Sequence, residues 1–107
     1  MTEQIENRVI NFLGLCMRAG RVISGQEACV DLARQEEAAL VLMDVAASEN
    51  TRKRITDACR SHSVPLYELS EGSLGHAIGK KGRMVAALKA DGMAQKLLTL
   101  LKDQQGL

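Results

Sequence analysis

Aromatic side chains are almost absent from this sequence. Its 107 residues contain no tryptophan, one phenylalanine, Phe12, and one tyrosine, Tyr67. Proteins that hold single-stranded nucleic acid by base stacking need several aromatic platforms. The composition therefore argues against that way of binding.

Cysteine is scarce as well, with three residues at Cys16, Cys29 and Cys59. The odd number and the wide spacing do not suit a disulfide framework, and the spacing of a zinc site is absent. Each cysteine stands among apolar residues. We therefore expect three reduced thiols in the core of a cytoplasmic protein, and no bound metal.

Long apolar runs are missing too. No stretch approaches the roughly 18 apolar residues of a membrane-spanning helix. The beginning of the sequence, MTEQIENR, is too polar for a signal peptide. We expect a soluble, cytoplasmic protein.

The net charge of +1 conceals an uneven distribution of charge along the chain. Residues 1–50 carry 4 basic and 8 acidic side chains, whereas residues 51–107 carry 10 basic and 5 acidic ones. A surface that binds anions is therefore expected to come mainly from the second half.

Hydrophobic periodicity predicts helices that alternate with strands. The predicted helices cover about residues 2–18, 26–37, 49–62, 74–78 and 93–101, and the predicted strands cover 21–24, 40–43, 66–69 and 84–88. This alternation predicts an α/β fold, a three-layer α/β/α sandwich around a mixed sheet of about four strands. We expect a single domain over residues 1–107, with frayed ends at about 1–3 and 104–107.

Single residues suggest where helices begin and which way side chains face. Ser48 or Asn50 is expected to cap the third helix and Ser73 the fourth. His62 is expected to face inward on the third helix, as a core or boundary histidine rather than a catalyst. Asp44, at the end of a buried strand, is more often a helix cap than a functional acid.

No group of residues assembles into a catalytic set. The glycine-rich stretch does not match a P-loop, because three residues separate Gly75 from Gly79 and Lys81 stands where Ser or Thr should follow Lys80. His76 has no nucleophile beside it in a recognisable arrangement. We predict that the protein is not an enzyme and uses no cofactor.

The densest basic cluster lies in the stretch LGHAIGKKGR, from Leu74 to Arg83. Its glycines let a backbone approach a partner closely, because a residue without Cβ imposes little steric limit. Its cations and exposed backbone N–H groups are natural partners for phosphate. The alternative is a solvated surface turn.

Part of the same stretch, Ile78 to Gly82, matches the I-G-x-x-G element of KH domains, whose loop clamps a nucleic-acid backbone. In a KH domain that loop joins two helices. The run from Met84 to Leu88 has the length and valine content of a strand, so helix or strand at this point separates the two folds.

Several short segments occur in an order and spacing typical of one family: Leu13-Gly14-Leu15, Arg18-Ala19-Gly20-Arg21, Ser24-Gly25, Leu40-Val41-Leu42, Ala47-Ser48, Asn50-Thr51, Val64-Pro65, Leu74-Gly75 and Ile78-Gly79-Lys80. With them the chain resembles the superfamily of the archaeal kink-turn-binding ribosomal protein L7Ae, and most closely its bacterial YlxQ-like branch, over about residues 9–103. The resemblance implies the α/β/α sandwich and a role in gripping kinked RNA at a kink-turn or related internal loop.

In relatives of that superfamily two loops hold the RNA, and they correspond here to the turn at Gly25 and to residues 79–84. The resemblance therefore places RNA contacts at the following positions: Arg21, Gly25, Gln26, Glu27, Ala28, Gly79, Lys80, Lys81, Gly82, Arg83 and Met84.

The chain also departs from the superfamily pattern. Kink-turn binders commonly read G-x-N-E-x-x-K at the first loop, whereas Gly25 is followed here by Glu27, Ala28 and Asp31 at the corresponding positions. An acid thus replaces the lysine that meets phosphate. Ala46 stands where relatives often carry an aspartate.

Two hypotheses follow. The leading one is a non-catalytic RNA-binding protein associated with the ribosome and translation, which docks structured RNA, including rRNA, as a monomer. The rival is a protein-interaction module that keeps the fold and has lost kink-turn specificity. Its support is the acidic first half of the chain.

Overall fold

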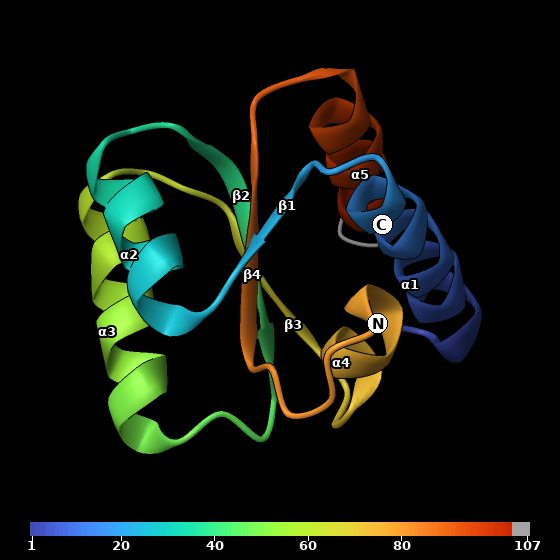
Figure 1. Cartoon of the computed structure of the whole chain (residues 1–107), viewed down its shortest axis with the longest axis horizontal. Helices are drawn as coiled ribbons and strands as arrows, with labels where there is room; N and C mark the ends of the chain where they lie inside the picture. Colours follow the sequence, from blue (N-terminus) through green and yellow to red (C-terminus); the bar gives the residue numbers. More distant parts are fainter. Residues whose placement is uncertain (104–107) are drawn as a thin grey trace.

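Five helices and four strands alternate along residues 1–103, the part of the chain that the computed structural model describes (Figure 1). The helices are α1 (Glu3–Arg18), α2 (Gln26–Arg34), α3 (Glu49–Ser61), α4 (Ser73–Ile78) and α5 (Gly92–Asp103). The strands are β1 (Val22–Ser24), β2 (Ala38–Asp44), β3 (Leu66–Leu69) and β4 (Val85–Lys89). All the predicted elements are present. The predicted fraying of 104–107 lies outside the described residues.

The strands form one mixed sheet in the order β1-β4-β2-β3. β2 is parallel to β3, and β4 is antiparallel to both of its neighbours, β1 and β2. Three strands therefore run in one direction and β4 runs in the other. The predicted α/β fold with a mixed sheet is confirmed.

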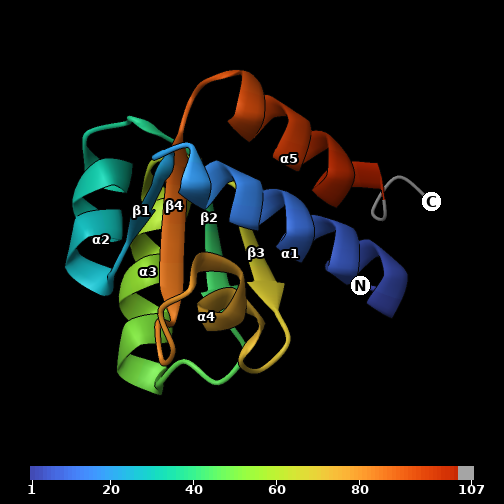
Figure 2. The same cartoon turned by 45° about the vertical axis from the view of Figure 1, so that its right-hand side comes forward.

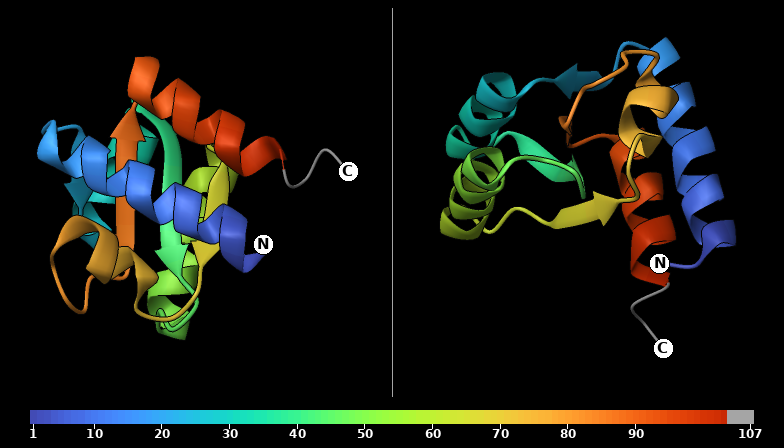
Figure 3. Two further views of the ribbon diagram at one scale, coloured as in Figure 1. Left: turned by 90° about the vertical axis from the view of Figure 1, so that its right-hand side faces the viewer. Right: turned by 90° about the horizontal axis from the view of Figure 1, so that it is seen from below.

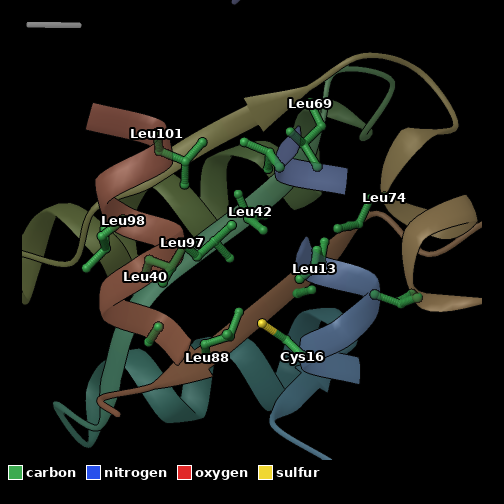
Figure 4. Packing of buried hydrophobic residues seen from close by; sticks show 14 residues of the cluster. Leu13, Cys16, Leu40, Leu42, Leu69, Leu74, Leu88, Leu97, Leu98 and Leu101 are labelled. Atoms are coloured by element: carbon green, nitrogen blue, oxygen red, sulfur yellow. The ribbon is translucent and has the colours of Figure 1, made fainter. Parts of the chain in front are cut away.

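Helices α1, α4 and α5 cover one face of this sheet (Figures 2 and 3). Successive side chains of a strand point to opposite faces, and Leu40 and Leu42 of β2 point to this one. They are fully buried together with Leu13, Leu74 and Leu97 from the three helices (Figure 4). Burial of each leucine contributes about 1.5–3 kcal/mol, so this cluster holds the helices on the sheet.

Helices α2 and α3 cover the other face. Val41 and Met43, the alternate residues of β2, pack there against Cys29 and Cys59. Burial raises the pKa of Cys29 to about 12 and that of Cys59 to about 11. Cys16, on the α1 side, is buried as well, and all three cysteines are free thiols, as the sequence predicted.

Helix starts follow local side-chain chemistry in α1 and α3. Thr2 Oγ1 accepts from the Ile5 N–H at 3.2 Å, and Ser48 Oγ accepts from the Thr51 N–H at 3.2 Å. Ser48, and not Asn50, is therefore the cap of α3.

Two local predictions are wrong. Ser73 does not cap α4, because the residue before the helix is Gly72 in a left-handed conformation and the Ser73 hydroxyl donates to Glu6 instead. His62 is not on the inward stripe of α3. It follows the last turn, half-buried, with Nδ1 3.6 Å from a Glu36 oxygen.

Within residues 1–103, no helix combines the length and the apolar character that crossing a membrane requires.

Candidate functional site

The carboxyl ends of β1, β2 and β3 and the amino end of β4 lie at one edge of the sheet. This edge carries the turn at Gly25, the segment 45–48 between β2 and α3, and the loop 79–84 between α4 and β4. We call these three segments the loop edge; they lie along the lower side of Figure 1. The sheet therefore makes neighbours of the two loops that the sequence singled out.

Gly25 and Arg83 join these two loops directly. The Gly25 N–H donates to the Val85 carbonyl at 3.0 Å, and its φ of +105° favours glycine. A Cβ at Gly25 would stand 2.8 Å from Arg83 Nη1. The absence of a side chain thus lets the guanidinium lie against the beginning of α2.

A chain of hydrogen bonds joins the beginnings of α2 and α3. Ser48 Oγ donates to Thr51 Oγ1 at 3.1 Å, and Thr51 Oγ1 donates to Gln26 Oε1 at 2.6 Å. Gln26 Nε2 donates to Glu27 at 3.0 Å, and Arg54 pairs with the other Glu27 oxygen at 2.7 Å. The side chains of Gln26 and Glu27 are therefore already engaged within the protein.

Asp44 anchors the middle of the loop edge. Its side chain is fully buried at the end of β2. One carboxylate oxygen accepts from the Ala46 N–H at 2.7 Å, and the other accepts from the Gly72 N–H at 2.8 Å. Its own N–H donates to the Met84 carbonyl at 2.8 Å. One residue thus fixes the exit of β2, the start of α4 and the end of the basic loop.

The loop 79–84 depends on glycine at three places. Gly79 ends α4 with φ +70°, and Gly82 has φ +86°, so both adopt the left-handed conformation. Between them, the Arg83 N–H donates to the Lys80 carbonyl at 3.1 Å and closes a turn. A Cβ on Gly75 would lie 2.9 Å from that same carbonyl oxygen. Gly75 therefore allows the loop to fold back onto α4.

Beside this loop lies an open hollow of about 430 Å³, which we call the glycine hollow. It is lined by Gly72, Gly75, His76, Gly79, Lys81 and Gly82. Four of these six lining residues are glycines, so backbone forms much of the wall.

Positive charge at the loop edge is uncompensated on the basic loop. Lys80, Lys81 and Arg83 are exposed, and none of them forms a salt bridge with any residue between 1 and 103. By contrast, Arg52 pairs with Glu68, and Arg54 pairs with Glu27. The three loop cations are therefore available to an external anion.

Ten of the eleven predicted contact positions lie on the loop edge or in the first turn of α2 beside it: Gly25, Gln26, Glu27, Ala28, Gly79, Lys80, Lys81, Gly82, Arg83 and Met84. Arg21 is not. It precedes β1 at the opposite edge of the sheet, where its Nε lies 3.6 Å from Asp91 Oδ2.

The KH interpretation of Ile78 to Gly82 is wrong, because the segment that follows is the strand β4 and not a second helix. Residues 1–103 also contain no cluster of His, Cys, Asp or Glu arranged to hold a metal ion.

Sequence reasoning missed the parts played by Thr51 and Arg54. Each forms a hydrogen bond with a residue of α2 that is more than twenty positions away in the chain. Helical periodicity does not predict such a distant partner. The polar residues Ser48 and Thr51, three positions apart at a helix start, were the available signal.

The sequence of residues 8–98 matches the model of the ribosomal protein L7Ae/L30e/S12e/Gadd45 family. The chain is 42% identical over 90 residues to the RNA-binding protein YlxQ of Bacillus subtilis (strain 168), a match covering 83% of this chain and 90% of the relative. It is 37% identical over 103 residues to the RNA-binding protein YlxQ of Enterococcus faecium, covering 95% of this chain and 99% of the relative.

Solved structures share the fold. A protein of unknown function from Bacillus halodurans C superposes with a TM-score of 0.81 at 31% identity, covering 89% of this chain and 97% of the other. The Giardia lamblia 15.5kD RNA binding protein superposes with a TM-score of 0.79 at 15% identity, covering 99% and 92% respectively.

Proposed function

Because the chain belongs to the ribosomal protein L7Ae/L30e/S12e/Gadd45 family, we propose that it is a non-catalytic RNA-binding protein of the translation apparatus. Its partner is structured RNA, docked on the loop edge. Two relatives above 35% identity that carry the name RNA-binding protein support this assignment.

One observation carries the proposal: Gly25 and the basic loop 79–84 lie against each other, with the Arg83 guanidinium between them. A phosphate here meets the exposed cations of the loop, which suit an anion. These two loops also correspond to the loops that hold RNA in the kink-turn-binding superfamily that this chain resembles.

The RNA that fits this edge is a kink-turn or a related internal loop, recognised mainly through its backbone. Ala28 offers no acceptor for a base edge, and the carboxylate of Glu27 is already bonded to Gln26 and Arg54. Contacts to phosphate position a nucleic acid without reading its sequence. We therefore expect strong salt dependence and a modest preference for the kinked form.

The experiment is a titration of the protein against a kink-turn RNA and a straight duplex of the same length and composition, at several salt concentrations. We expect a log–log salt slope of several units for both RNAs, and tighter binding of the kink-turn. Equal affinities would remove the kink-turn part of the proposal. If the protein binds neither RNA at low salt, the proposal itself is wrong.

The acidic side chains of the first half count against the rival protein-interaction module. Glu27 and Glu37 form salt bridges with Arg54 and Lys89 of this same chain, and a Glu36 oxygen lies 3.6 Å from His62 Nδ1. Glu3, Asp31 and Glu49 of the first half are exposed and form no salt bridge within residues 1–103. The two salt bridges compensate part of the acidic surface from within and reduce what it offers to a basic protein.

A further inference from the structure

A second hollow lies between α1 and α4. These two helices face the viewer in the left panel of Figure 3. Its volume is about 200 Å³, and it is lined by Ile10, Asn11, Gly14, Arg18, His76 and Ala77. We call it the α1–α4 groove. Asn11, Arg18 and His76 place polar groups along it, and all three residues are exposed.

The α1–α4 groove continues the glycine hollow of the loop edge. His76 lines both hollows, the glycine hollow on one side and the groove on the other. The floor of the groove is set by Gly14, because a Cβ there would stand 3.3 Å from the Ala77 carbonyl oxygen. A ligand lying on the basic loop can therefore extend past His76 without leaving the surface.

The charge in the groove is positive and uncompensated. Arg18 forms no salt bridge with any of residues 1–103. Glu6, an acid of the same helix, lies three turns away and accepts bonds from Ser70 and Ser73. Arg21, at the other edge of the sheet, is by comparison paired with Asp91. Arg18 is thus free to bind an anion, whereas an anion at Arg21 would compete with Asp91.

We propose that the α1–α4 groove holds the sugar–phosphate backbone of an RNA strand that leaves the loop edge. Arg18 binds a phosphate, while Asn11 and His76 hydrogen-bond to phosphate or ribose oxygens. These residue types commonly contact the nucleic-acid backbone. Asn11 and Arg18 are separated by about 10 Å along α1, so they reach more than one nucleotide. This inference rests on the proposed function and extends it beyond the two loops.

The groove is tested with Arg18→Ala in the full chain, against two kink-turn RNAs that differ only in stem length. The matched control is Arg60→Ala, which removes an exposed and unpaired arginine from α3 on the opposite face. Arg18→Ala should weaken binding of the long-stemmed RNA roughly three- to tenfold and reduce its salt slope by about 0.7–0.9 unit. Arg60→Ala should change neither quantity.

The short-stemmed RNA and a conservative variant complete the test. A stem that ends at the loop edge cannot reach the groove, so Arg18→Ala should leave its affinity unchanged. Arg18→Lys keeps the charge and should keep the salt slope for the long-stemmed RNA.

Two results separate failure of this inference from failure of the proposed function. If the parent binds both RNAs and Arg18→Ala behaves as Arg60→Ala does, the groove is no part of the site. The groove is equally excluded if Arg18→Ala weakens both RNAs to the same degree. If the parent binds neither RNA, the proposed function itself has failed.

Discussion

At the scale of single residues, Gly82 separates two uses of glycine. Its φ is +86°, and a Cβ added there would meet nothing within 4 Å. A side chain at this position would therefore clash with no atom of the protein itself. It would strain the backbone, and it would stand where a bound partner approaches.

Replacing Gly82 by Asn and by Val should distinguish these uses. Asn tolerates positive φ far better than a β-branched residue does, so Gly82→Asn should keep a thermal midpoint close to that of the parent while Gly82→Val lowers it. Both variants should bind RNA more weakly, because both place a side chain where the backbone of the partner approaches. RNA binding by Gly82→Asn at the parental affinity would show that the glycine only makes the turn.

Asp44 gives a prediction about stability. In Asp44→Asn one accepting carboxylate oxygen is replaced by an amide NH₂, which can only donate. It then faces another donor, the N–H of Ala46 or of Gly72, and that hydrogen bond is lost. Loss of a buried hydrogen bond costs about 1–3 kcal/mol, and urea unfolding should show a decrease of that size. Asp57→Asn, which alters an exposed acid of α3, is the control. Equal stability of the two variants would mean that Asp44 does not hold the loop edge.

At the scale of elements, α2 carries the main departure from the superfamily pattern. Asp31 is exposed on α2, one turn beyond Glu27, at the position where the kink-turn-binding pattern has a lysine. Because Arg54 already neutralises Glu27, a charge change at Asp31 should act on RNA more than on the helix.

Asp31→Lys should therefore strengthen binding of kink-turn RNA and steepen its salt slope by about one unit. Asp57→Lys makes the same change in charge on α3 and should have little effect on either quantity. If the two lysine variants behave alike, α2 does not face the RNA.

The interface between α2 and α3 gives a prediction about pH. Burial raises the pKa of Cys29 to about 12 and that of Cys59 to about 11, above the ordinary thiol value of 9.0. Unfolded thiols lose their protons from about pH 9 upward, whereas the folded ones keep theirs. The unfolded state then binds fewer protons, so the free energy of unfolding falls as pH rises from 9 to between 11 and 12.

Urea unfolding at several values of pH measures this decrease. The double variant Cys29→Ala, Cys59→Ala has no such thiols at this interface, so its stability should fall less steeply over the same range. Parallel curves for parent and variant would contradict the assignment.

The order of the elements was predictable because it depends on local signals. Helical and strand hydrophobic periodicity alternate along the chain, and this alternation predicted all nine elements. Leu40 to Met43 was recognisable as a strand buried on both faces. Contacts between elements were not predictable. The Thr51–Gln26 bond and the packing of Arg83 against Gly25 join distant positions that periodicity does not relate. The prediction that Ser73 caps α4 failed because its hydroxyl donates to Glu6, a residue of α1.

At the scale of the whole molecule, exposed cations occur on two different surfaces. Arg34, Lys53 and Arg60 on α2 and α3 are exposed and unpaired in the described part of the chain, as are the cations of the basic loop. The two sets carry equal charge on different surfaces.

Replacing Lys80, Lys81 and Arg83 by Ala should reduce the log–log salt slope of RNA binding by about two to three units without unfolding the protein. Replacing Arg34, Lys53 and Arg60 by Ala should reduce it far less, although net charge changes equally. Equal reductions would show that overall charge, and not a defined surface, drives binding. Circular dichroism of each variant serves as the folding control.

The strand order has a further consequence, for the timing of folding during synthesis. Within the described sheet β1 pairs with β4 alone, so Val22 cannot enter the sheet before Leu88 has been synthesised. The Gly25 turn is likewise fixed by the Val85 carbonyl. Contacts between residues so distant in the chain form slowly and late. A growing chain that ends before β4 can have its helices in place and still lack the loop edge, and it gains the surface proposed to hold RNA only when its last strand enters the sheet.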